Sequence, residues 1–262
     1  MKKNDFYKNE KNTPVSEEVS ETNVVCGRNA VLELLRSGRS VDKIFIKKEL
    51  EGALLVIAGE AKARGVVMIE SRHEKLDALA NGVIHQGVVA LAAEKEYVGV
   101  DDILKIAEDK GEKPFIVILD SINDPHNLGA IIRSCDGAGV HGVIMAKRHS
   151  APLSPTVSKS SAGAVEHMAV AKVSNINNTI NDLKEKGLWI VGCEADGVRY
   201  DTIDFDMPVA IVLGSEGDGI SPLVKKNCDF IASIPMLGKV NSLNVSCAAA
   251  VVLFEAARQK RS

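Results

Sequence analysis

The fold is decided by the stretch LDSINDPHNLGAIIR, residues Leu119–Arg133. A buried strand is predicted to end near Asp120, a polar turn containing Pro125 follows, and helical spacing of apolar residues continues to Arg133. We expect Asn127 to cap this helix, so that its amide faces the space beyond the strand end. Arg133 stands on an otherwise apolar helix, where its fork of donors suits a phosphate or carboxylate. A capped helix with a surface arginine is the plain alternative.

Two further segments repeat this layout of strand end, glycine-containing polar turn and helix start. Residues Ile211–Ser221, IVLGSEGDGIS, place Glu216 in a turn whose glycines let a ligand approach the backbone closely. The glycine spacing is not GxGxxG, so a dinucleotide site is not indicated. Residues Ile234–Ser246, IPMLGKVNSLNVS, form an irregular loop that leads into a helix predicted over Asn244–Gln259. Each segment taken alone also fits a solvated turn with ordinary helix caps.

The same alternation on both sides predicts an α/β domain with a mostly parallel sheet. Apolar runs of buried-strand length lie at Phe115–Leu119, Gly142–Ala146, Leu188–Cys193 and Val209–Leu213. In such sheets ligands bind beyond the carboxyl ends of the strands, where the three segments are expected to meet. The loop Lys147–Ala164 adds positive charge suited to phosphate contact, although a solvated basic loop is the more common explanation.

A smaller α/β domain is predicted ahead of this one, over residues 24–93. Its expected helices are Asn29–Arg36, Gly52–Arg64 and a short one from Ser71, and its expected strands are Lys43–Ile46, Val66–Ile69 and Val88–Ala92. Residues 94–112 hold three basic and seven acidic residues and are interpreted as a linker. Residues 1–23 lack apolar periodicity and are interpreted as a disordered tail, which leaves 113–262 as the larger domain.

The composition of the 262 residues excludes several classes of protein. With 45% hydrophobic and 26% charged residues, the chain has ample material for a core. Five scattered cysteines form no CxxC pair and have no histidine at ligand spacing, so neither a disulfide framework nor a zinc site is indicated, and a reducing cytoplasm is expected. No apolar stretch is long enough for a membrane span, and residues 1–12 lack the apolar core of a signal peptide.

The three segments together carry a family resemblance. NDPHNLGAIIRSCDGAGV, IVLGSEGDGIS and IPMLGKVNSLNVSCAAAVVLFEA resemble, in order, the motifs of the SpoU/TrmH RNA 2′-O-ribose methyltransferases of the SPOUT class. The segments VVCGRNAVLELLRSG and HQGVVAL resemble the small ribosomal-protein-like substrate-binding domain of the rRNA-directed branch. Within the family, the chain is most similar to the bacterial 23S rRNA guanosine-2′-O-methyltransferases of the RlmB type.

The resemblance implies a fold, a cofactor and a set of residues. It implies S-adenosyl-L-methionine bound in a trefoil knot of the SPOUT domain, and an obligate homodimer built through the knotted region. By motif position it implies a catalytic set of Asn127, Arg133, Glu216, Ser242 and Asn244, and cofactor contacts from Gly214, Ile234, Met236 and Leu243. The candidate RNA-binding residues are Arg28, Lys147, Arg148 and Lys159, and neither a metal nor a membrane is expected as a partner.

The three motifs offer no evident acceptor for the proton of the ribose hydroxyl. A guanidinium stays protonated in proteins, so we expect Arg133 to grip an RNA phosphate and stabilise developing alkoxide charge rather than to act as a base. Asn127 and Glu216 are expected to hold Arg133 in place. The catalytic set could also be assembled across the dimer.

The net charge of −3 is compatible with an RNA partner because it is unevenly distributed. Residues 24–93 carry ten basic and eight acidic residues, whereas the acidic excess lies chiefly in residues 94–112. The smaller domain is therefore mildly basic, as modest phosphate contact requires. Only 4% of residues are aromatic, which favours RNA recognition by backbone, shape and hydrogen bonds over serial base stacking.

Two other functions stay open. A tRNA ribose methyltransferase would carry nearly the same catalytic motifs, and the domain at 24–93, which the tRNA branch typically lacks, is the discriminating feature. A non-catalytic RNA-binding or ribosome assembly protein would use that domain alone, and the intact polar set in the larger domain weighs against it.

Overall fold

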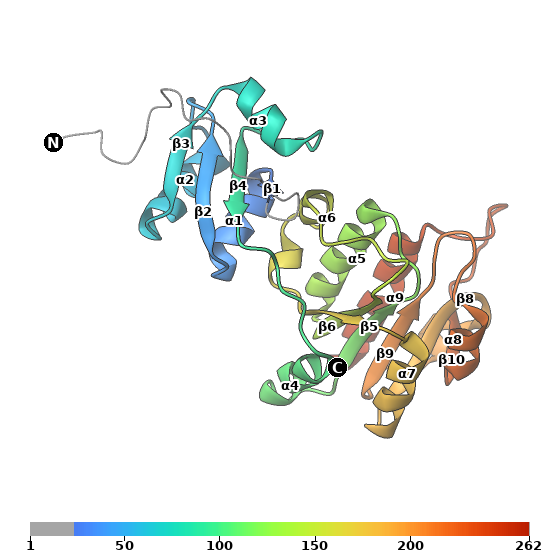
Figure 1. The fold of residues 1–262 in the computed structure, drawn as a ribbon. Coiled ribbons are helices and arrows are strands. Elements are labelled where there is room, and N and C mark those ends of the chain that lie inside the picture. Colours follow the sequence, from blue (N-terminus) through green and yellow to red (C-terminus); the bar gives the residue numbers. More distant parts are fainter. Residues whose placement is uncertain (1–23, 262) are drawn as a thin grey trace. The chain divides into compact units, whose positions relative to one another are not determined.

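The computed structural model describes residues 24–261, so the predicted tail at 1–23 lies outside the described residues. The chain divides into two compact units (Figure 1). Residues 24–96 and Pro152–His167 form the first unit, and Tyr97–Ala151 with residues 168–261 form the second. Within residues 24–261 no helix combines the length and the apolar character needed to cross a membrane.

The first unit is a four-stranded mixed sheet with helices on both faces. Its elements before residue 96 are β1 (Val24–Cys26), α1 (Arg28–Ser37), β2 (Val41–Ile46), α2 (Ala53–Ala63), β3 (Val67–Glu70), α3 (His73–Ala80) and β4 (Val88–Ala92). The strand order is β1-β4-β2-β3, with β4 antiparallel to both neighbours and β2 parallel to β3. Leu34 and Ile57 of α1 and α2 bury against one face, and Leu76 of α3 against the other. The elements expected here are confirmed, with ends shifted by at most two residues.

Residues 152–167 join the first unit through a buried ion pair. They form α6 (Pro155–Ser160) and the 3-10 turn η2 (Ala164–Glu166), which contact α1. Nη1 of Arg39 donates to both carboxylate oxygens of Glu166, at 3.0 and 2.8 Å, and the Glu166 side chain is 1% exposed. Burial raises the pKa of Glu166, and the charge of Arg39 opposes that shift. Because the partners lie 127 residues apart, no local pattern in the sequence predicts this pair.

The second unit is built on a six-stranded sheet. Its elements are α4 (Val100–Asp109), β5 (Phe115–Leu119), α5 (Pro125–Ala138), β6 (Gly142–Ala146), β7 (Val170–Val173), α7 (Ile176–Glu185), β8 (Trp189–Arg199), η3 (Tyr200–Thr202), β9 (Val209–Leu213), α8 (Pro222–Asn227), β10 (Phe230–Ser233) and α9 (Val245–Lys260). The strand order is β10-β8-β9-β5-β6-β7, and every neighbouring pair is parallel. The expected α/β class with a parallel sheet is confirmed.

Both faces of this sheet are buried. Alternate strand residues such as Ile116 and Ile118 form one core with side chains of α4, α7 and α8. The intervening residues, such as Val117 and Leu119, are equally buried and point to the other face. There α5 and α9 pack against each other (Figure 1). Burial on both faces explains why these strands are continuous apolar runs in the sequence.

The acidic segment 94–112, expected to be a linker, contains α4 of the second unit. Ile103 and Ala107 of this helix are fully buried, while Asp101, Asp102 and the other acidic residues face solvent. Ile103 lies on Gly142 of β6, where an added Cβ would stand 2.6 Å from Ile103 Cγ1. The negative charge is therefore largely the exposed face of an amphipathic helix, whose apolar face packs on the sheet.

Candidate active site

Three loops reach the carboxyl edge of the six-stranded sheet because all of its strands run parallel. The first loop follows β5 and leads into α5, the second follows β9 and leads into α8, and the third follows β10 and leads into α9. β5 and β9 are direct neighbours, and β8 alone separates β9 from β10. The fold thus brings together the three segments that the sequence singled out.

Asp124, and not Asn127, is the N-cap of α5. Its carboxylate accepts the backbone N–H groups of His126 and Asn127, both at 3.1 Å, and Pro125 occupies the first helical turn. The expectation that Asn127 caps the helix is therefore wrong, because an acidic residue directly before proline starts the helix one turn earlier. Asn127 is 8% exposed, and its side chain is left available for contacts with the other loops.

A chain of hydrogen bonds joins the three loops through Asn127. Its Nδ2 donates to Oε2 of Glu216 at 3.0 Å, and its Oδ1 accepts from Nδ2 of Asn244 at 3.0 Å. Asn244 is the N-cap of α9, and its Oδ1 accepts the backbone N–H and the hydroxyl of Ser246 at 2.9 and 2.6 Å. Both ends of the Asn127 amide are used, so the amide fixes the spacing between Glu216 and Asn244.

Two carboxylates that the sequence did not single out fix the loop that carries Glu216. Asp120, at the end of β5, accepts the backbone N–H of Ser221 at 2.8 Å. Glu194 of β8 accepts the backbone N–H of Ile220 at 2.5 Å. The sequence could have indicated Asp120, because it directly follows the apolar run of β5. It could not have indicated Glu194, because the role of Glu194 depends on β8 lying beside β9.

Gly214 lets the same loop fold back on itself. An added Cβ at Gly214 would lie 2.1 Å from the carbonyl carbon of Gly219 and 2.2 Å from the nitrogen of Ile220. The loop closes through mutual backbone hydrogen bonds between Ser215 and Gly219, at 3.0 and 3.1 Å. A side chain at position 214 is therefore incompatible with this loop.

The loop after β10 presents apolar side chains to solvent. Leu237 is 100% exposed and Leu243 is 41% exposed, while Ile234 and Met236 are half-buried. A loop that exposes aliphatic side chains at the carboxyl edge of a parallel sheet offers a surface for a partly apolar ligand. The residues expected to touch a cofactor lie on this loop and on the neighbouring turn at Gly214.

Arg133 and Ser242 lie outside the hydrogen-bonded chain of Asn127. Arg133 is exposed on α5, and six residues separate it from Asn127, which places the two side chains on different faces of the helix. Asn127 and Glu216 bond each other, and among the described residues of this one chain neither bonds Arg133. Ser242 is exposed in the loop before α9.

The four cationic candidates are divided between the units. Lys147 and Arg148 are exposed directly after β6 in the second unit, and Arg28 begins α1 in the first. Lys159 of α6 is less accessible: an added Cβ at Gly27 would lie 2.5 Å from its Nζ, and burial lowers its pKa. Lys159 thus packs against the β1–α1 turn of the first unit.

Two cysteines of the second unit have thiols of low acidity. Cys193 lies in β8 and Cys228 directly follows α8, and both are at least partly buried. Burial raises the pKa of Cys193 to about 12 and that of Cys228 to about 11. Both remain thiols at neutral pH, and a thiol is a poor nucleophile.

Comparison with known proteins assigns a family model to each part of the chain. Residues 114–254 match the model described as the SpoU rRNA methylase family. Residues 24–98 match the model described as RNA 2′-O ribose methyltransferase substrate binding.

A curated relative is similar over nearly the whole chain. The putative TrmH family tRNA/rRNA methyltransferase YacO of Bacillus subtilis is 43% identical over 90% of this chain and 95% of its own.

Solved structures agree with this assignment. The SpoU methyltransferase AviRb from Streptomyces viridochromogenes, in complex with AdoMet, is 26% identical with a TM-score of 0.75, covering 91% of this chain and 90% of its own. The A. aeolicus TrmH/SpoU tRNA modifying enzyme is 29% identical with a TM-score of 0.53, covering only 62% of this chain and 83% of its own.

Proposed function

We infer the function from one premise, that the chain belongs to the SpoU/TrmH family of RNA 2′-O-ribose methyltransferases. It is an S-adenosylmethionine-dependent enzyme that methylates the ribose 2′-hydroxyl of RNA. Within that activity, we propose a nucleotide of 23S rRNA as the target, guanosine as its base, the cytoplasm as the compartment and a homodimer as the working form.

The first unit supports rRNA over tRNA as the substrate. It matches a substrate-binding model over residues 24–98, a region additional to the catalytic family model at 114–254. The tRNA modifying enzyme of A. aeolicus is similar over only 62% of this chain, about the share that the second unit occupies. A tRNA target is the second candidate, because the name of the Bacillus subtilis relative includes both RNAs.

The residues at the sheet edge fit S-adenosylmethionine. The cradle at Gly214, which a Cβ would fill, and the apolar loop with Ile234, Met236 and Leu243 combine backbone polar groups with aliphatic surface. Such a surface suits an adenine ring and a methionyl chain. When bound, the cofactor supplies a methyl group that its sulfonium already activates. We propose that a knot formed by these loops holds it.

The chain's own residues then align and polarise the ribose hydroxyl. We assign Asn127, Glu216 and Asn244 to orientation, because their hydrogen bonds fix all three loops relative to one another. Ser242 is assigned a polar contact with the substrate from the neighbouring loop. Arg133, always protonated, is assigned to the phosphate and to stabilisation of developing alkoxide charge. Lys147 and Arg148 add charge for the RNA backbone.

The isolated position of Arg133 supports a site completed by a second subunit. Within one chain it faces away from Asn127, so an Arg133 from a partner would supply the guanidinium that the three loops lack. Mixing an Arg133→Ala chain with an Asn244→Ala chain tests this arrangement. Recovery of methyl transfer in the heterodimer is expected, and a heterodimer as inactive as either variant would contradict a shared site.

The substrate is tested by transfer of labelled methyl groups from S-adenosylmethionine to purified transcripts. We expect incorporation into 23S rRNA at one ribose and none into bulk tRNA. Incorporation into tRNA alone would establish the second candidate.

A further inference from the structure

The first unit contains a pocket beside α3. It has a volume of about 840 Å³, within the range of ligand pockets, and it opens between α3, the following turn and the ends of β2 and α1. Its wall is apolar at Leu76, Val83 and Ile84, and Ile84 is 74% exposed. The residues lining it include four cationic ones, Arg28, Lys47, Lys48 and Arg72, and two acidic ones, Glu49 and Asp77.

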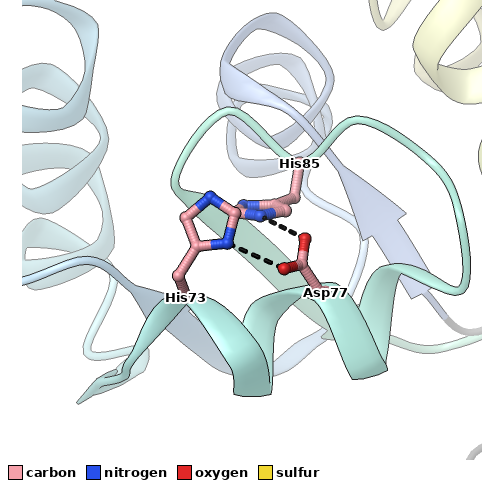
Figure 2. A group of neighbouring side chains, drawn as sticks. All are labelled: His73, Asp77 and His85. Carbon is pink, nitrogen blue, oxygen red and sulfur yellow. Dashed lines mark hydrogen bonds and ion pairs between the residues drawn. The ribbon is translucent and has the colours of Figure 1, made fainter.

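Two histidines and an aspartate line the pocket (Figure 2). Nδ1 of His73 lies 2.8 Å from one oxygen of Asp77, and Nε2 of His85 lies 3.1 Å from the other. The hydrogen bond from His73 lowers the pKa of Asp77. His85 is 5% exposed, whereas the His73 side chain is 74% exposed. The buried ring therefore anchors the carboxylate, and the exposed ring is presented to a ligand.

The tautomer of His85 argues against a metal at this cluster, although its three ligand atoms lie within 4.8 Å of one another. Nδ1 of His85 accepts the backbone N–H of Gly87 at 2.9 Å, so the neutral ring carries its proton on Nε2. That proton is the one shared with Asp77. A metal on Nε2 would move the proton to Nδ1, where it would oppose the N–H of Gly87.

The turn that follows α3 also fixes a cation at the rim. Gln86 adopts a φ of 53°, which is costly for a residue with a side chain and persists where surrounding contacts hold it. Gly87 follows with a φ of 88°, which glycine adopts freely. In this turn Gln86 accepts the Nε–H of Arg28 on its carbonyl and the backbone N–H of Arg28 on its side chain, both at 3.1 Å. These two bonds orient the guanidinium of Arg28 but do not involve its two terminal nitrogens.

We propose that this pocket receives one unpaired nucleotide of the RNA substrate, with the base against Ile84 and His73 and the phosphate at the Arg28 and Arg72 rim. The inference rests on the proposed function and names where RNA is held. A recessed pocket with an apolar wall fits a base taken out of its stack, whereas paired RNA offers proteins its phosphates and shallow minor groove. The aromatic-poor composition is consistent with a single such pocket.

Two matched pairs of variants test the two halves of the pocket. Arg72→Gln removes a rim cation, and Arg64→Gln removes an exposed arginine of the same unit outside the pocket. Ile84→Ala truncates the most exposed residue of the apolar wall, and Leu55→Ala truncates an exposed residue, at 57%, on α2. Binding of a 23S rRNA transcript to each full-length variant is measured against salt. A single-stranded and a double-stranded RNA of equal length serve as competitors.

We expect Arg72→Gln to weaken binding by about fivefold and to lower the salt slope by about one, while Arg64→Gln changes neither. Ile84→Ala should weaken binding about threefold with an unchanged salt slope, because only apolar contact is lost. Wild type should favour the single-stranded competitor, and Ile84→Ala should reduce that preference.

The proposal is contradicted if Arg72→Gln and Ile84→Ala bind the transcript as their control variants do. It is also contradicted if the double-stranded competitor displaces the transcript as effectively as the single-stranded one. Methyl transfer is measured on the same preparations. A wild type that binds the transcript but methylates no RNA contradicts the proposed function, whereas an active wild type with indifferent pocket variants contradicts only the pocket.

Discussion

Replacement of Asn127 by aspartate tests the central hydrogen bond of the candidate active site. The substitution keeps the size of the side chain and replaces Nδ2 by oxygen, which then faces Oε2 of Glu216 at the original 3.0 Å. A donor becomes an acceptor, and two carboxylates meet. The contact from Asn244 to the other oxygen is unaffected, so the change is confined to the Glu216 side.

The expected loss in methyl-transfer rate follows from the distance between the two carboxylates. Two unit charges 3 Å apart repel by about 1.4 kcal/mol in water and by about 5.5 kcal/mol at an effective dielectric constant of 20. Asn127 is buried but Glu216 is exposed, so screening keeps the value in the lower half of that range. We expect about 2 kcal/mol, a loss of roughly 30-fold in methyl transfer at pH 8.

The pH dependence of the Asn127→Asp rate distinguishes carboxylate repulsion from a general loss of structure. One proton shared between the two carboxyl groups restores a hydrogen bond, and like charges raise the pKa at which that proton binds. The ratio of variant to wild-type rate should therefore rise as the pH falls from about 8 to about 5.5. Asn127→Ala, which cannot bind a proton there, should show a constant ratio.

The assay is the initial rate of labelled methyl transfer to 23S rRNA at saturating cofactor, with cofactor affinity measured separately by calorimetry. An aspartate variant with wild-type rate at pH 8 would refute the reasoning. So would a reduced rate whose ratio to wild type stays flat across the pH range.

The remaining predictions concern stability and the loop anchors. Arg39→Met removes the guanidinium bonded to the buried Glu166 carboxylate, while the charge of Lys95 still offsets part of the loss. It should lower the free energy of unfolding by about 3 kcal/mol at pH 7, against about 0.5 kcal/mol or less for the exposed Arg36→Met, by denaturant titration. Because Glu166 has a raised pKa in the folded state, its folded form binds the proton more readily, so the deficit of Arg39→Met should shrink as the pH falls. Gly214→Ala should abolish S-adenosylmethionine binding in calorimetry, because its Cβ would stand 2.1 Å from Gly219, while Gly59→Ala, which meets open space, should bind as wild type does. Asp120→Asn should weaken the same binding about tenfold, since the backbone N–H of Ser221 loses a charged acceptor.

The elements that carry the site could be predicted because their signals are local. The apolar runs of β5 and β9, the helix after Asn244 and the polar turns between strand and helix are all properties of short stretches. Parallel pairing then follows from strand–helix alternation, and it brings the three loops to one edge.

The features that could not be predicted from the sequence depend on contacts between residues far apart in the chain. Glu194 became an anchor because β8 pairs with β9, and Glu166 became a core residue because Arg39 lies opposite it. The acidic α4 was interpreted as part of a linker because its charge outweighed one short helical pattern of apolar residues, of which Ile103 and Ala107 are the fully buried positions. Those positions act only when Gly142 offers space for Ile103.

The central claim, methylation of a single ribose in 23S rRNA, is tested most directly by mapping 2′-O-methyl groups in the rRNA and tRNA of a deletion strain. We expect the loss of one 2′-O-methyl position, in 23S rRNA, and its return when wild type, but not Asn127→Asp, is supplied. Loss of a tRNA position with an unchanged rRNA pattern would contradict the claim, as would an unchanged pattern in both RNAs.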